Sequence, residues 1–374
     1  MKPNLRLAVV PLLLGAVCAA APFKLIGNGA ELFLTGSAAL RADDNIFLTK
    51  DGESDLVFEI TPGAELTFGH NSQLKGSLKL KEQFLNYSDH DELNTNLFSG
   101  VFGSSFDDGK LKLRLGLRFD ELNQNSFDVR PTLAGRTPGL VRRDIFAVNA
   151  DGEMELTPLL SLGTGVSYTS DKYKRDGFSN VRGLTVPIDF YRKYTAKSDL
   201  SFGYRYRDTQ VTRGLDSTEH FFNLGARGEF TPKLSGRVAV GLNRRTLSRG
   251  GSDNQLGLDA AFAYELTPKA SLELAATNDF ATSPQGQSIR NSTLRAQVLA
   301  RVAVEWSLIG GVSWRAIDYG PRTDDYYEVQ AAAAYVVNAN IRVLGGFVHR
   351  NYSSSALFAE FRNNVFSLSA DFRY

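Results

Sequence analysis

Basic side chains recur at every second position in several stretches of the chain, for example KLKLRLGLRFD at residues 110–120. A guanidinium group binds carboxylate, sulfate or phosphate groups through two parallel hydrogen bonds. Arginines that line a wet channel therefore favour an anionic polymer or solute. The arginines at such alternating positions are Arg114, Arg118, Arg205, Arg207, Arg237, Arg295, Arg301 and Arg342.

Acidic side chains occupy equivalent polar positions and allow a second interpretation of the arginines. Opposite charges on neighbouring strands commonly pair across a sheet. The arginines would then form structural ladders instead of a substrate path, and both interpretations stay open. The acidic residues concerned are Glu153, Asp259, Glu265, Glu273, Glu305, Glu328 and Asp371.

Patterns that would indicate catalysis or metal binding are weak. The pair Glu219 and His220 could belong to a hydrolytic site, but the end of a polar loop is the usual setting for such residues. Asp43 and Asp44 with Asn45 could hold a cation, although this composition favours a turn. We therefore predict that the protein is not an enzyme, with no catalytic residues, no metal and no cofactor.

The elements that carry these residues are strands. A period of two sends successive side chains to opposite faces of a β-strand, so each stretch has an apolar and a polar face. A single soluble β-domain rarely exceeds about 250 residues, whereas residues 22–374 run as one series without a linker. We predict an all-β fold, a transmembrane antiparallel up-and-down β-barrel with leucines facing lipid and polar faces lining a lumen.

The connections between the strands are of two alternating kinds. Tight turns such as Thr157-Pro158, Thr231-Pro232 and Thr267-Pro268 alternate with longer polar segments such as 43–54 and 123–138. Bacterial outer-membrane barrels have short periplasmic turns and longer extracellular loops. The count predicts about 18 strands with both termini on the periplasmic rim, and a count of 16 satisfies the same parity.

The N-terminus has the layout of a secretory signal peptide. In residues 1–21, basic side chains precede a short apolar run and a stretch of small residues. Lipoprotein processing at Cys18 fits less well, because Val17 precedes the cysteine. We predict cleavage after this segment and a single outer-membrane barrel domain over residues 22–374, with no cysteine left to form a disulfide.

Charge and hydropathy exclude two classes of protein. Removal of Lys2 and Arg6 changes the formal net charge from +1 to −1, so no basic excess indicates a nucleic-acid partner. After the signal peptide, no stretch approaches the roughly 20 consecutive apolar residues of a membrane helix. The predicted location is the bacterial outer membrane, as an integral protein surrounded by lipid and lipopolysaccharide.

The chain ends in VFSLSADFRY, an alternating strand that closes on an aromatic residue. This ending resembles the assembly signal that the barrel assembly machinery reads in outer-membrane barrels, although phenylalanine is commoner than tyrosine at the last position. An edge strand of a secreted sandwich could end in the same way. The residues of the predicted signal are Phe366, Leu368, Phe372 and Tyr374.

The stretch RADDNIFLTKDGESDLVFEITPGAEL, residues 41–66, resembles the opening of the outer-membrane beta-barrel porin 2 family, which is often associated with exopolysaccharide gene clusters. The matching residues are Asp43, Asp44, Asn45, Phe47, Asp55, Pro62 and Gly63. The resemblance implies an integral barrel of about 18 strands that conducts a secreted polysaccharide, with a periplasmic polysaccharide-export protein as partner.

Three functions follow from these observations. The first is export of an exopolysaccharide, which the resemblance and the basic lumen faces favour. The second is a general or anion-selective diffusion porin for small anionic solutes, which the barrel alone would support. The third is a surface enzyme or adhesin, which the long outer loops would support.

Overall fold

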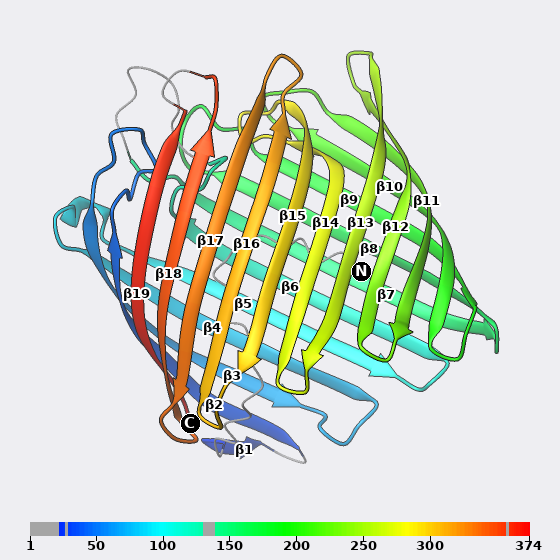
Figure 1. The fold of residues 1–374 in the computed structure, drawn as a ribbon, viewed down its shortest axis with the longest axis horizontal. Coiled ribbons are helices and arrows are strands. Elements are labelled where there is room, and N and C mark those ends of the chain that lie inside the picture. The colour runs from blue at the N-terminus through cyan, green and yellow to red at the C-terminus, as the bar shows by residue number, and fades with distance from the viewer. Residues whose placement is uncertain (1–21, 27–28, 130–138, 357–358) are drawn as a thin grey trace.

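The computed structural model describes residues 22–26, 29–129, 139–356 and 359–374, and these form one antiparallel sheet rolled into a barrel (Figure 1). A three-residue strand, Lys24–Ile26 (β1), precedes the barrel. The barrel strands are Ala30–Asp43 (β2), Asp55–Phe68 (β3), Leu74–Tyr87 (β4), Thr95–Asp107 (β5), Leu111–Asn123 (β6), Arg142–Thr157 (β7), Leu160–Tyr173 (β8), Val181–Lys193 (β9), Ser198–Val211 (β10), Ser217–Thr231 (β11), Leu234–Leu247 (β12), Ser252–Thr267 (β13), Ala270–Thr282 (β14), Ser288–Arg301 (β15), Trp306–Asp318 (β16), Thr323–Val336 (β17), Ile341–Ser353 (β18) and Phe361–Arg373 (β19).

The barrel is closed by pairing between its first and last strands. Each strand from β2 to β19 pairs with the next one along the chain, and β19 pairs with β2 from Arg373 opposite Thr35 to Val365 opposite Asp43. β1 pairs only with the first residues of β2 and is not part of the ring. The predicted antiparallel barrel of 18 strands is therefore confirmed.

Successive side chains of each strand point alternately to the outer and the inner surface of the wall. Leu113, Leu115 and Leu117 on β6 are 44%, 40% and 38% exposed on the outside, although they are large and apolar. A continuous outer surface of such residues is far larger than the apolar patches that monomeric soluble proteins normally expose to water. Hydrocarbon around a closed barrel covers this surface, and closure pairs the backbone groups that an open edge would leave unsatisfied.

The two rims differ in the length of their connections. The turns 158–159, 232–233 and 268–269 lie on one rim, here called the short-turn rim, and the register shifts beside each of these turns. The connection 44–54 and the described segments 124–129 and 139–141 lie on the opposite, long-loop rim. The predicted alternation of short turns and longer loops is confirmed.

The first residues of β2 and the C-terminal residue lie on the short-turn rim, as the strand parity predicts. The Leu34 amide donates to the Tyr374 carbonyl at 2.6 Å, and the Tyr374 amide donates back to the Leu34 carbonyl at 2.8 Å. The C-terminus and β1 lie together at the lower end of the barrel in Figure 1. The signal-peptide prediction falls on residues 1–21, which lie outside the described residues.

Two connections differ from the sequence-based expectation. Val302, Val304 and Trp306 continue the alternation of the preceding strand, so the sequence predicts one strand through them. The structure ends β15 at Arg301, places 302–305 in a turn and begins β16 at Trp306. This turn contains neither Gly nor Pro, and it therefore lacks the usual turn signals.

The second difference is a long-loop connection at 88–94 that the sequence analysis does not identify. It contains the 3-10 helix Asp91–Leu93 (η1). In the described part of the chain, no helix has the length and apolar character needed to cross a membrane.

Candidate functional site: the lumen and its mouth

Contacts between strands that are not neighbours identify the inner face of the wall. Arg205 Nη2 on β10 lies 2.9 Å from Asp279 Oδ1 on β14, four strands along the sheet. Side chains can meet across four strands only on the concave side. Arg205 is flanked by Tyr204 and Tyr206, which stack with His220 on the opposite face.

By this alternation, all eight predicted arginines face the lumen, but most of them are engaged with neighbouring side chains. Arg237 pairs with Asp259 at 3.3 Å, and Arg342 pairs with Asp371 at 2.7 Å. The remaining side-chain contacts of this set are Arg295 Nη2 to Gln297 Oε1 at 2.6 Å, Arg118 with Asp120, and Arg207 with Glu219. The interpretation that the arginines form structural ladders with neighbouring side chains therefore describes much of the set of eight arginines.

A buried charge network fills the inner face of β10–β14 toward the long-loop rim. Glu219 is fully buried and accepts hydrogen bonds from Arg207 and from Arg245, whose Nη2 lies 2.6 Å from Glu219 Oε1. Asp279 joins Arg205 and Arg207. Arg245 and Asp279 were not among the predicted site residues, although both follow the alternation of their strands.

The hydrolytic interpretation of Glu219 and His220 does not fit this geometry. Glu219 points into the lumen network, whereas His220 points outward, where its Nδ1 lies 2.8 Å from the Tyr204 hydroxyl. Adjacent residues of a strand face opposite sides of the wall. The two side chains therefore cannot share a reacting group.

A second inner surface, on β4 and β6, is basic and exposed. The side chains of Lys79 and Arg118 are 48% and 47% exposed, in contrast to 6% for Arg205 and 3% for Arg245 in the buried network. We call this surface the basic wall. Its residues are Lys75, Lys79, Lys81, Lys112, Arg114 and Arg118, all exposed and all on the inner side of their strands.

In the part of the chain that the structure describes, two of the six cations of the basic wall are paired with a carboxylate. Lys79 pairs with Glu65 at 3.0 Å, and Arg118 pairs with Asp120. Among the described residues, Lys75 and Lys81 have no carboxylate within 4.0 Å. Lys75 was not among the predicted candidates, although it has the same strand parity as Lys79.

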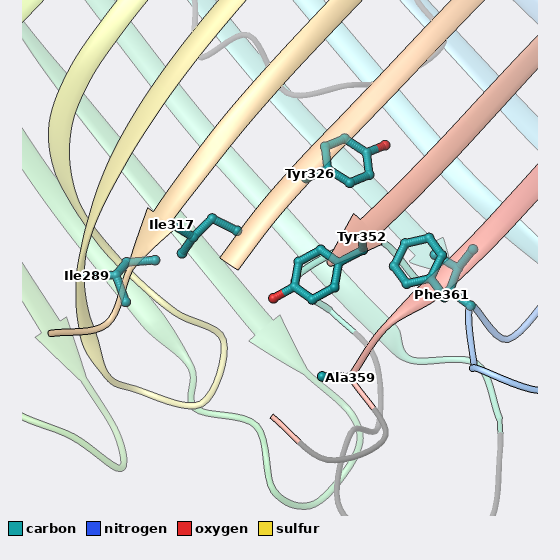
Figure 2. Packing of buried hydrophobic residues seen from close by; sticks show 7 residues of the cluster. Ile289, Ile317, Tyr326, Tyr352, Ala359 and Phe361 are labelled. Carbon is teal, nitrogen blue, oxygen red and sulfur yellow. The ribbon is translucent and has the colours of Figure 1, made fainter. Parts of the chain in front are cut away.

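The long-loop rim is crossed by loops that fold into the mouth of the barrel. Leu48, from the connection 44–54, packs into an apolar cluster on the inner face of β15–β19. Figure 2 shows members of this cluster lying together: Ile289, Ile317, Tyr326, Tyr352 and Phe361 come from neighbouring strands, and Ala359 comes from the connection before β19. Leu48 adopts a positive φ of 54°, which is uncommon for a residue with a side chain.

A second loop reaches almost straight across the lumen. Phe127 follows β6, yet its ring centroid lies 4.8 Å from that of Tyr326 on β17, and Arg315 on β16 stacks over it at 4.4 Å. β6 and β16 are eight strands apart by the shorter way around the ring. Asn125 joins the two loops by donating to the Phe47 carbonyl at 2.8 Å.

A third contact links two further loops across the same rim. The Ser179 amide, between β8 and β9, donates to the Pro284 carbonyl, between β14 and β15, at 2.7 Å. The Ser179 hydroxyl donates to the Arg213 carbonyl at 2.8 Å. The lumen therefore narrows at the long-loop rim, where, in the described part of the chain, loops from at least five connections meet one another or the far wall.

The motif that carries the family resemblance builds the barrel seam and the first loop. Asn363 on β19 donates to Asp43 Oδ1 at 2.6 Å, and the Asn364 amide donates to Asp44 Oδ1 at 2.6 Å. Asn45 donates to the Thr49 carbonyl at 2.7 Å. These carboxylates and the amide shape a turn, and within the described residues no cluster of three His, Cys, Asp or Glu side chains could hold a metal ion.

The rest of the motif has local structural contacts. Asp55 Oδ1 accepts the Ser88 amide at 2.9 Å, and Asp55 Oδ2 lies 2.8 Å from His90 Nδ1. Pro62 and Gly63 lie within β3, where a Cβ on Gly63 would be 2.7 Å from the Leu80 carbonyl oxygen. Phe47 packs into the apolar cluster at the long-loop end of β3–β5.

The predicted assembly residues form the outer face of β19. Phe366, Leu368, Phe372 and Tyr374 are 60%, 58%, 44% and 49% exposed, as expected for contact with lipid. This strand forms the seam with β2, and the recognition of these residues by an assembly machinery stays a prediction.

Comparison with known families gives a match to the C-terminal part of the barrel. The range 198–374 matches the family described as "Putative beta-barrel porin 2". The match begins at the first residue of β10 and covers the strands up to β19. It confirms the resemblance to the beta-barrel porin 2 family drawn from residues 41–66, although that stretch lies outside the matched range.

Solved structures similar to this chain are outer-membrane barrels. The FrpB iron transporter of Neisseria meningitidis (F5-1 variant, apoprotein form) has a TM-score of 0.50 at 9% identity, over 90% of this chain and 63% of that one. OccK11 (OpdR) of Pseudomonas aeruginosa has a TM-score of 0.49 at 12% identity, over 94% of this chain and 100% of that one.

The chain therefore spans less than two thirds of the FrpB chain. Curated protein sequences give no match. At these identities the likeness to solved structures concerns the fold alone. The closed barrel and the porin match point to an outer-membrane channel and not to an enzyme.

Proposed function

We propose that the barrel conducts an acidic exopolysaccharide across the outer membrane. The observation that carries the proposal is the basic wall, which presents six exposed lysines and arginines to the lumen, two of them paired with a carboxylate among the described residues. Fixed positive charges in a narrow water-filled passage raise the local concentration of anions. The polysaccharide identity rests on the family resemblance and on the gene clusters associated with that family.

The position of the basic wall fits entry from the periplasm. Lys112 and Arg114 lie at the short-turn end of β6, and Lys81 lies farther along the lumen. Beyond them the inner faces of β3–β5 become apolar at Leu85, Tyr87 and Leu97, which the first loop covers. A polymer would therefore meet the cations first and the loops of the mouth afterwards.

The partners follow from this orientation. A periplasmic polysaccharide-export protein would dock on the short-turn rim, the barrel assembly machinery would insert the chain through β19, and lipid with lipopolysaccharide would cover the outer face. Residues 1–21 would direct export across the inner membrane and then be removed. Each of these is part of the proposal.

Export is tested by deleting the gene in a strain that makes the polymer and returning variants on a plasmid. Loss of surface polymer with continued synthesis is expected, and wild type should restore it. The double variant Lys79→Glu and Arg118→Glu should restore less than half of it, because it reverses charge on the basic wall. Outward-facing, exposed Lys172 and Arg244, both changed to Glu, serve as the matched control and should restore it fully.

Two results would contradict the proposal. Unchanged secretion in the deletion strain would exclude export of this polymer. Full restoration by the charge-reversed variant would exclude the basic wall from the path.

A second candidate is an anion-selective diffusion porin, and the same exposed wall favours it. The exposed cations alone would be enough to attract small anions into the lumen, and this function does not require an extended polymer as the transported molecule. Normal secretion combined with anion-selective conductance of the purified protein would support this function over export.

A further inference from the structure

Four cations on the inner face of β4 and β6 surround an open area of the wall, here called the floor. Register places Lys79 on β4 opposite Val101 on β5, which is opposite Arg118 on β6. Lys75 and Arg114 form a second row in the same way, on either side of Ser105 on β5. Lysines therefore lie on one side of β5 and arginines on the other. We call Lys75, Lys79, Arg114 and Arg118 the four-cation frame.

The row between the two cationic rows has almost no side chains. It consists of Ser77, Gly103 and Gly116. A Cβ built on Gly103 or Gly116 would have no heavy atom within 4 Å, so the space above both glycines is open. Elsewhere the inner wall is filled: a Cβ on Gly203 of β10 would lie 2.2 Å from Asp189 Oδ1.

The dimensions of the frame exceed those of a small anion. Neighbouring strands are about 4.8 Å apart and a strand advances about 3.3 Å per residue. The two sides of the frame are therefore about 10 Å apart, and its two rows are about 13 Å apart along the strands. A single carboxylate, sulfate or phosphate can bind at one row, whereas an extended polyanion can bind at both rows together.

Two cations of the frame have acid partners but keep exposed surface. Lys79 pairs with Glu65 and Arg118 pairs with Asp120; the two cationic side chains are 48% and 47% exposed, whereas the two acids are 12% and 9% exposed. An incoming carboxylate can therefore bind to the exposed side of each cation, beside its acid partner, and each row alone would bind a single sugar acid loosely.

We propose that the four-cation frame is a two-row binding site for an acidic oligosaccharide segment. Acid groups of the oligosaccharide bind to the row of Lys79 and Arg118 and to the row of Lys75 and Arg114. The sugar ring between these acid groups lies over Gly103 and Gly116. The arginine side binds planar carboxylates through two hydrogen bonds, and the lysine side supplies point charges. This proposal rests on the proposed passage of an acidic polysaccharide and specifies where the polymer is bound.

The two-row site makes affinity depend on the length of the ligand. Binding at a second row becomes intramolecular once the first row is occupied, and such coupling raises affinity on the order of 10²-fold. The open space above the floor matters equally for this gain in affinity, because a larger side chain in place of Gly116 would block the sugar ring that connects the two bound acid groups.

The test uses refolded full-length barrel in detergent and oligogalacturonates from monomer to hexamer, with binding measured by calorimetry. Wild type should bind the hexamer at least about tenfold more tightly than the monomer. Gly116→Val should remove most of that gain and leave monomer binding within about twofold. Gly310→Val is the matched control, because Gly310 is outward-facing and its Cβ position is equally open.

A second pair of variants keeps the test independent of the glycine change. Lys75→Gln with Arg114→Gln removes one row, and monomer should still bind at the other row while the gain with length disappears. If the affinity of Gly116→Val or of the row variant increased with ligand length as it does in wild type, the two-row site would be overturned. Absence of any binding to wild type would instead overturn the proposed function itself.

Discussion

The ring of Phe127, in the loop that follows β6, lies 4.8 Å from the ring of Tyr326 on the opposite wall. Arg315 stacks on the same ring at 4.4 Å. The free loop would not adopt this position without the far wall, because β17 and β16 are seven and eight strands from β6 around the barrel. We therefore expect docking of this loop to limit how far the mouth is open.

Phe127→Ala is expected to open the mouth. The aromatic pair and the cation–π contact each contribute about 0.5 to 1 kcal/mol or somewhat more, so their loss should raise the undocked fraction about tenfold. Planar-bilayer recordings should show more frequent and larger open events. Gln124→Ala, at an exposed position of the same loop, is the control. Identical recordings for Phe127→Ala and wild type would argue against a docked loop.

Glu219→Gln is expected to destabilise the barrel strongly. It leaves the partly buried Arg207 and the buried Arg245 without their shared carboxylate, and breaking a buried ion pair costs about 3 to 5 kcal/mol. Glu229→Gln on the same strand is the control, since Glu229 pairs with exposed Lys197 and should change stability by less than about 1 kcal/mol. Urea unfolding in detergent micelles measures both. Equal stability of the two variants would contradict the structural role of the network.

Val240→Arg is expected to cost about 2 to 4 kcal/mol, because this residue lies near the middle of β12 and faces outward, where it is 42% exposed. Thr277→Arg places the same charge on the inner, wet side of β14 and should be nearly neutral. Folding yield into lipid vesicles compares the two. A larger loss for the Thr277 variant would mean that the faces of the wall are assigned the wrong way round.

The loop around η1 should be sensitive to pH through His90. The hydrogen bond with Asp55 raises the pKa of His90 above the ordinary 6.5, burial opposes this, and Glu53 and Glu92 add to the rise. A raised pKa means that the protonated imidazole stabilises the folded loop below pH 6.5, and that this contribution is lost as pH rises through the folded-state pKa.

The measurement is thermal unfolding of wild type and His90→Gln over this pH range. Wild type should exceed the variant most at acidic pH, and the difference should shrink at alkaline pH. A difference that grows with pH would show that the neutral imidazole is the stabilising form.

The barrel itself was predictable because alternation in sequence is a direct consequence of strand geometry. Leu113, Leu115 and Leu117 identify the lipid face without any knowledge of neighbouring strands. The same parity correctly placed Arg114 and Arg118 on the inner side. Turn chemistry located the Thr-Pro connections, and it failed at 302–305, where turn residues are absent.

The division of the arginines into buried and exposed groups could not be predicted from alternation. It depends on which strands face one another across the lumen and on how closely the wall curves, as at Arg205 and Asp279. The inward path of the loop that carries Phe127 likewise depends on long-range packing. The open floor at Gly103 and Gly116 required the register of three strands.

The most direct test of the central claim is the reversal potential of the purified protein in a planar bilayer under a potassium chloride gradient. We predict anion selectivity for wild type, because the basic wall presents six exposed cations to the lumen. Lys79→Glu with Arg118→Glu should shift the reversal potential toward that of potassium. Cation selectivity of wild type, or a reversal potential that this double variant leaves unchanged, would contradict the account.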